Sequence, residues 1–75
     1  MITYEYDKLM GKRIREIRES KNLTQENLSA KLQVIGCDIT RSALAKIEVG
    51  QRHIYSFEIK CLKEALNIEF EELFA

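Results

Sequence analysis

The chain has 75 residues, a length that accommodates one small domain with a single hydrophobic core. Hydrophobic residues make up 45% of it and proline is absent, a composition that favours an ordered, largely helical chain over a disordered one. The formal net charge is zero, but residues 1–53 hold ten Lys and Arg against seven Asp and Glu (+3), whereas residues 54–75 hold two against five (−3). Such a polarised chain is compatible with a basic surface that binds a polyanion.

Several functional classes are disfavoured by what the sequence lacks. No apolar run approaches the roughly 20 residues of a membrane span, and the N-terminus does not resemble a signal peptide, so we expect a cytoplasmic protein. Cys37 and Cys61 do not form a C-x-x-C unit, which predicts free thiols and neither a metal nor a cofactor. The single histidine, His53, has no nucleophile or carboxylate at motif spacing, so we expect no catalytic residue and no small-molecule ligand.

The first predicted helix spans residues 8–21 and begins the predicted domain, residues 8–75. Met10, Ile14 and Ile17 recur in it at helical spacing and define a buried face. Residues 1–7 are predicted to form a separate arm. Ile2, Tyr4 and Tyr6 alternate there as in a strand with one apolar face. Pairing with a second copy, packing across the helices and mobility all remain open for this arm.

Two short helices follow, and each has a threonine at its expected start. Thr24 can cap the second helix after a left-handed stop at Asn22, and Leu28 and Leu32 mark its buried face. Thr40 can cap a third helix that ends before Gly50, a residue suited to a C-terminal cap. In this third helix Leu44 and Ile47 are expected to point inward.

The last two predicted helices carry most of the aromatic residues. A fourth helix is expected from a cap at Ser56 to about Asn67, with two apolar faces: Ile59, Leu62 and Leu66 on one, and Phe57, Cys61 and Ala65 on the other. It would be a central core helix, or core on one face and subunit interface on the other. A short fifth helix, "EFEELF", carries Phe70, Leu73 and Phe74, which are expected in the core or at an interface.

Five short helices, with the second and third joined by a turn, predict a helix-turn-helix unit. The segments "IREIRESKNLTQENLSAKL" and "ITRSALAKIEVGQR" resemble the Cro and phage-repressor type (XRE-like) family of helix-turn-helix DNA-binding regulators, and "LKEALNIEFEELF" looks like its closing helices. The resemblance covers about residues 9–74. It implies an all-α, compact five-helix domain with the lambda-repressor-like fold. One departure is the segment from Gln33 to Asp38, which is longer than the usual turn of that family and affects the expected docking geometry.

The outward face of the third helix is the predicted reader of bases. At 100° per residue, Ser42 and Lys46 lie opposite the apolar stripe, with Arg41 and Ala45 at its flanks. An arginine in the first turn of a recognition helix can donate two hydrogen bonds to guanine in the major groove. We therefore expect base contacts from Arg41, Ser42, Ala45 and Lys46, with Arg41 first among them, although side chains of these types are ordinary surface in most helices.

Phosphate contacts are expected from the residues that flank the groove. Gln25 matches the family glutamine that typically bonds a phosphate, and Thr24, Thr40, Gln51 and Arg52 are placed to assist. The resemblance also implies an ion pair between Arg18 and Glu48 that ties the first helix to the third. We expect this pair to orient the third helix and not to contact DNA.

These observations favour a sequence-specific DNA-binding transcriptional regulator, expected to act as a repressor and a homodimer on double-stranded DNA. The expected dimer contacts are Phe57, Phe70, Leu73 and Phe74. The alternative is a protein-interaction module of the same fold, such as an antitoxin-like partner, which the near-zero net charge and the long turn favour. An enzyme is the least favoured class. The operator, the direction of regulation and any inducer are not encoded in recognisable motifs.

Overall fold

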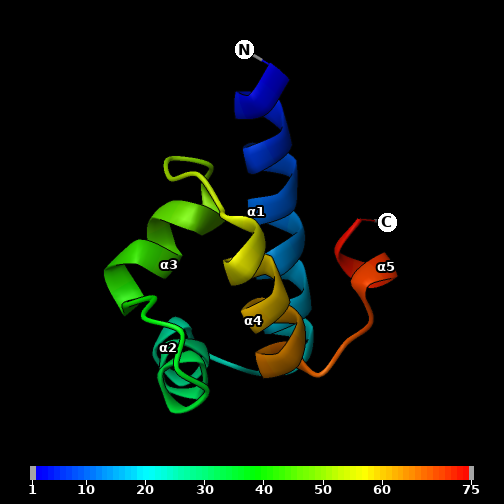
Figure 1. The fold of residues 1–75 in the computed structure, drawn as a ribbon. Helices are drawn as coiled ribbons and strands as arrows, with labels where there is room; N and C mark the ends of the chain where they lie inside the picture. Colours follow the sequence, from blue (N-terminus) through cyan, green and yellow to red (C-terminus); the bar gives the residue numbers. More distant parts are fainter. Residues whose placement is uncertain (1, 75) are drawn as a thin grey trace.

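The computed structural model describes residues 2–74, with side chains from residue 5. This part of the chain contains five α-helices (Figure 1). In chain order they are α1 (Ile2–Ser20), α2 (Gln25–Val34), α3 (Arg41–Glu48), α4 (Ser56–Leu66) and α5 (Phe70–Leu73). Within these residues there is no strand, and the predicted all-α class is confirmed. In Figure 1, α3 and α5 lie on opposite sides of α1 and α4.

One core collects the apolar faces of all five helices. The inward residues predicted from helical spacing are buried in it: Met10, Ile14, Ile17, Leu28, Leu32, Leu44, Ile47, Leu62 and Leu66. Ile59 and Ala65 are partly buried against this cluster. A helix of eight to eleven residues is marginal in water by itself, so this shared burial is what stabilises α2, α3 and α4. Across residues 2–74, no helix has the length and apolar character needed to span a membrane.

The strand-like pattern expected in the N-terminal arm is wrong, because α1 already begins at Ile2. A strand needs a partner for its backbone hydrogen bonds, and residues 2–74 contain no other strand, whereas a helix satisfies those groups within the segment. Tyr6, the one aromatic of the alternating set with a described side chain, is exposed. Met1 and the side chains of Ile2 and Tyr4 lie outside the described residues.

The start of α4 also differs from expectation. Tyr55 is the N-cap residue and Ser56 is the first helical residue. No side chain at the cap position accepts a hydrogen bond from the first turn, so the capping expected of the Ser56 hydroxyl is wrong; instead the Glu58 carboxylate reaches back and its Oε1 accepts from the backbone N–H of Tyr55 at 3.1 Å. At the other end, Asn67 adopts the left-handed conformation (φ 56°) and closes the helix.

The C-terminal aromatic residues divide between core and surface. Leu73 is buried, which confirms the expected place in the core and leaves its side chain unavailable for the alternative, a subunit interface. Phe57, Phe70 and Phe74 are 62%, 44% and 58% exposed. The core expectation therefore fails for Phe70 and Phe74, which remain available for contacts with another molecule.

The long turn between α2 and α3 is packed against the rest of the fold. Cys37 and Ile39 are buried, and Gly36 has a φ of +87°, which provides the expected bend. The carbonyl oxygen of Ile39 accepts hydrogen bonds from Ser29 Oγ at 2.9 Å and from Gln33 Nε2 at 3.2 Å. The additional residues are thus anchored to α2, and α3 starts from a fixed point.

Cys37 and Cys61 are buried free thiols, as expected. Burial raises the pKa of Cys37 to about 12, and a hydrogen bond with the Cys61 thiol contributes in the same direction. Because the thiolate is the nucleophile and the metal ligand, the raised pKa disfavours reactivity of Cys37 in the folded chain.

Helices α1 and α3 pack closely at Gly11. A Cβ atom placed on Gly11 would lie 2.0 Å from the carbonyl oxygen of Ile47 and 3.0 Å from its carbonyl carbon. Both are backbone atoms of α3, so neither can rotate out of the way. The missing side chain therefore sets the distance between α1 and the last turn of α3.

We expect Gly11→Ala to lower the free energy of unfolding by about 1–3 kcal/mol, because α3 must shift to relieve the overpacking. Urea unfolding followed by circular dichroism measures this loss. Lys12→Ala, at an exposed neighbouring position, is the control and should change the stability by less than about 0.5 kcal/mol. Equal stability of Gly11→Ala and the native chain would show that α1 and α3 do not depend on this contact.

Candidate nucleic-acid interface

Helix α3 presents one apolar and one polar face. The Thr40 hydroxyl caps it by accepting a hydrogen bond from the N–H of Ala43 at 3.2 Å, as predicted. Leu44 and Ile47 are completely buried, whereas the opposite face is exposed to solvent. That opposite face carries the four predicted base-contacting side chains: Arg41, Ser42 and Lys46, which are exposed, and Ala45, which is partly exposed.

The start of α2 forms a second polar surface. Thr24 Oγ1 accepts from the N–H of Asn27 at 2.9 Å, and Asn27 Oδ1 accepts in return from the N–H of Thr24 at 3.1 Å. These bonds use the cap hydroxyls of Thr24 and Thr40 as acceptors. Each hydroxyl still has its own hydrogen to donate, and the positive end of the helix lies beside it, a combination suited to an anion such as a phosphate.

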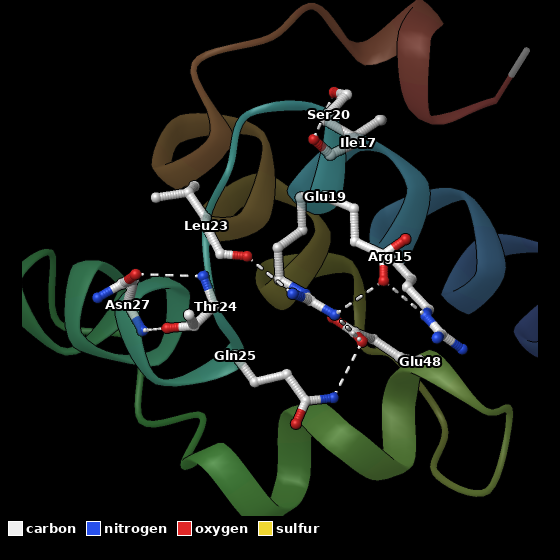
Figure 2. Close-up of polar contacts among 10 residues, drawn as sticks. Arg15, Ile17, Glu19, Ser20, Leu23, Thr24, Gln25, Asn27 and Glu48 are labelled. Carbon is white, nitrogen blue, oxygen red and sulfur yellow. Dashed lines mark hydrogen bonds and ion pairs between the residues drawn. The ribbon is translucent and has the colours of Figure 1, made fainter.

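A buried ion pair joins α1 to the last residue of α3 (Figure 2). Arg18 Nε donates to Glu48 Oε2 at 2.7 Å and Arg18 Nη2 donates to Glu48 Oε1 at 3.0 Å, which confirms the pair that the resemblance implied. These hydrogen bonds raise the pKa of Arg18, against the opposing effect of burial. Arg18 Nη1 also donates to the carbonyl of Leu23 at 2.8 Å, so one guanidinium on α1 bonds both the turn that leads into α2 and the end of α3.

Gln25 belongs to the same cluster, which sequence reasoning did not find. Its Nε2 donates to Glu48 Oε1 at 3.1 Å, and Figure 2 shows the side chain extending from the start of α2 towards Glu48. The two residues are 23 positions apart on different helices. No periodicity connects them, and only the packing of α2 on α3 brings them together.

The loop after α3 carries the remaining two predicted phosphate contacts, one exposed and the other bound within the chain. Gly50 adopts a φ of +78° and ends the helix region, as expected, and Gln51 after it is exposed. Arg52 is instead bound in a two-pronged ion pair, with Nη1 and Nη2 each donating to Glu58 at 2.9 Å. This pairing raises the pKa of Arg52 and lowers that of Glu58. Much of the positive charge expected at this loop is therefore neutralised within the chain.

His53 contacts an acidic side chain of α1. The Nδ1 atom of His53 lies 3.1 Å from Asp7 Oδ2, an exposed contact between the loop and α1. Among the described residues, no three His, Cys, Asp or Glu side chains are grouped closely enough to hold a metal ion.

A short, capped and outward-facing α3, carried on α2 through a turn, defines a helix-turn-helix DNA-binding regulator. The sequence profile of the helix-turn-helix family matches residues 14–73, and this chain belongs to that family. Control protein C.BamHI from Bacillus amyloliquefaciens is 33% identical over 66 residues, which cover 87% of this chain and 75% of that protein. The restriction-modification controller protein C.AhdI from Aeromonas hydrophila has the same fold, with a TM-score of 0.85 and 36% identity over 99% of this chain and 100% of the other.

The comparisons confirm the predicted family, fold and DNA-binding regulatory role. The partner of this family is double-stranded DNA, and its members are regulators rather than enzymes. Which residues of this chain contact the DNA remains a prediction from the sequence and the geometry.

The Arg52–Glu58 pair predicts a pH dependence of stability. Because the pKa of Glu58 is lowered in the folded chain, its contribution is present at neutral pH and is lost as the pH falls below the ordinary range of a glutamate. We expect Glu58→Gln to cost about 1 kcal/mol at pH 7 and to flatten the decline in stability towards pH 3. Urea unfolding at several pH values measures both effects, with the exposed Glu64→Gln on the same helix as the control. An unchanged pH profile in Glu58→Gln would contradict the role of this pair.

Proposed function

We propose that this protein is the transcriptional controller of a restriction-modification system and that it binds a promoter as a homodimer with α3 in the major groove. The solved relative at 36% identity is described as a restriction-modification controller, and the second relative as a control protein. We further propose that the dimer acts as a repressor, because a protein seated in the major groove of a promoter keeps other proteins from the same DNA. A cytoplasmic location, and an activity without catalysis or a small-molecule ligand, belong to this proposal.

The exposed face of α3 carries the proposal. Arg41 lies in the first turn of α3, the end that enters the groove in helix-turn-helix docking, and its side chain is exposed. Ser42 and Lys46 share this face, and Ala45 offers a methyl group for contact with a thymine. The buried residues of α3 hold the helix from behind, so its polar side chains need no rearrangement of the core to meet a base edge.

Phosphate contacts at the edges of α3 would fix the register of the protein on DNA. Thr24, Gln25 and Thr40 sit at helix starts with donors available, and Gln51 is exposed after α3. Arg52 remains part of this proposal in a weaker form, because its guanidinium would have to serve a phosphate while it is bound to Glu58.

The homodimer is proposed from the surface of α4 and α5. Phe57, Phe70 and Phe74 are large, exposed apolar side chains, and a 75-residue domain gains stability from burying them. In Figure 1, α5 lies on the side of the body opposite α3, so contacts through it would leave the polar face of α3 free. Two α3 helices related by a two-fold axis would read two half-sites about one helical turn apart.

Selection of bound DNA from a random duplex pool, near physiological salt, tests the DNA-reading proposal. We expect the native chain to enrich two related half-sites, and Arg41→Ala to lose preference at one base of each, at a cost of about 1–3 kcal/mol. Lys60→Ala, at an exposed position on α4, is the control and should keep the native motif. Absence of any enriched motif with a folded native chain would contradict the proposal and favour a protein partner.

Sedimentation velocity tests the dimer. We expect Phe57→Glu and Phe74→Glu to shift the chain from dimer to monomer at micromolar concentration, because each places a charge on the proposed apolar contact. Val34→Glu places the same charge on an apolar side chain of α2 that is 85% exposed, and it should leave the dimer intact. A native chain that sediments as a monomer, or a Val34→Glu effect as large as that of the phenylalanine variants, would contradict the assignment.

A further inference from the structure

We propose that Glu48 is a positioning residue for DNA binding, and that its buried carboxylate orients the amide of Gln25 so that an N–H group points towards a phosphate. The inference rests on the proposed phosphate contact of Gln25 and assigns the residue that controls it. Glu48 itself touches no DNA, since its side chain is only 1% exposed.

The carboxylate of Glu48 accepts hydrogen bonds from side chains of both α1 and α2. Both of its oxygens accept from Arg18, and Oε1 additionally accepts from Gln25 Nε2 at 3.1 Å (Figure 2). The two-pronged bond to Arg18 leaves acceptor capacity on both carboxylate oxygens. The third bond reaches to the first residue of α2, the position that the family resemblance associates with a phosphate.

The chemistry of the two groups fixes the direction of the amide. An ionised carboxylate only accepts hydrogen bonds, so Gln25 must turn its nitrogen, and not its oxygen, towards Glu48. That nitrogen carries two hydrogens, and among the hydrogen bonds of residues 2–74 only one is used. A phosphate oxygen is also purely an acceptor, and the second N–H on the same nitrogen matches it. Without Glu48, the terminal torsion of a glutamine is broad and the amide would present either end.

The location of Gln25 supports this role. The residue is half-buried at the positive end of α2, next to the capped Thr24, where backbone N–H groups already favour an anion. Arg18, through its bond to the Leu23 carbonyl, holds the same end of α2 from the opposite direction. The cluster therefore keeps the start of α2 at a set distance from α3, and it fixes the phosphate contact relative to the base-reading face.

A double-mutant cycle tests the inference, with the selected DNA duplex as the probe and dissociation constants measured below the melting temperature of every variant. Gln25→Met removes the donor and keeps the length of the side chain. We expect it to weaken binding about tenfold in the native background, equally for all base substitutions in the duplex, which is the loss expected for one hydrogen bond to a charged group. In a Glu48→Gln background the same change should weaken binding less than about twofold, because the amide of Gln25 is no longer held.

Gln51→Met is the matched control, since Gln51 is a proposed phosphate contact with no bond to Glu48. Its effect on binding should be the same in both backgrounds. A merely structural role of Glu48 would lower the stability and leave the effects of Gln25→Met and Gln51→Met equally unchanged. Should Glu48→Gln fail to fold because Arg18 loses its charged partner, Glu48→Asp, which keeps the charge and shortens the reach to Gln25, takes its place in the cycle.

These outcomes distinguish a failure of the proposed function from a failure of the role proposed for Glu48. A native chain that binds no DNA overturns the proposed function. A native chain that binds DNA, with no effect of Gln25→Met or with an equal effect in both backgrounds, overturns only the role of Glu48. A side-chain amide resonance of Gln25 that shifts on Glu48→Gln and again on addition of DNA to the native chain would support it independently.

Discussion

The position of α3 depends on the buried contact between Arg18 and Glu48. A buried ion pair contributes little net stability over an apolar pair of the same size, because both charges lose their hydration. Its value lies in geometry: the guanidinium bonds Glu48 in two places and the Leu23 carbonyl in a third, so three elements meet in one fixed arrangement. If either partner is removed, the other charge remains buried without compensation, and the orientation of α3 is lost together with stability.

Close packing and helix capping also hold α3 in place. The absence of a side chain at Gly11 allows the backbone of α1 to approach the carbonyl of Ile47, which brings α1 and the last turn of α3 close together. Thr40 starts α3 at a defined residue, and the anchored turn around the buried Cys37 holds the segment before it. A helix of eight residues has too few internal hydrogen bonds to persist in water, so this external framework is what makes it a rigid surface for recognition.

The polar residues of the fold perform two different tasks. Arg41 and Lys46 are exposed, and neither forms an ion pair with another described residue. Their charges are therefore available to a polyanion. Glu58 instead neutralises Arg52 within the chain. Counting charges along the sequence overestimates the basic surface for this reason, since part of the charge is consumed by contacts between elements.

The sequence by itself determined the helical class, the core faces and the capped starts at Thr24 and Thr40, because these follow from periodicity and from hydrogen bonds within a few residues. Resemblance to a family supplied the Arg18–Glu48 pair. Only the tertiary structure decided which polar groups meet across helices, such as Gln25 with Glu48, since no local rule relates residues 23 positions apart. It also decided that Leu73 is buried while Phe74 is exposed, because the burial of a residue in so short a helix depends on how α5 packs against α1.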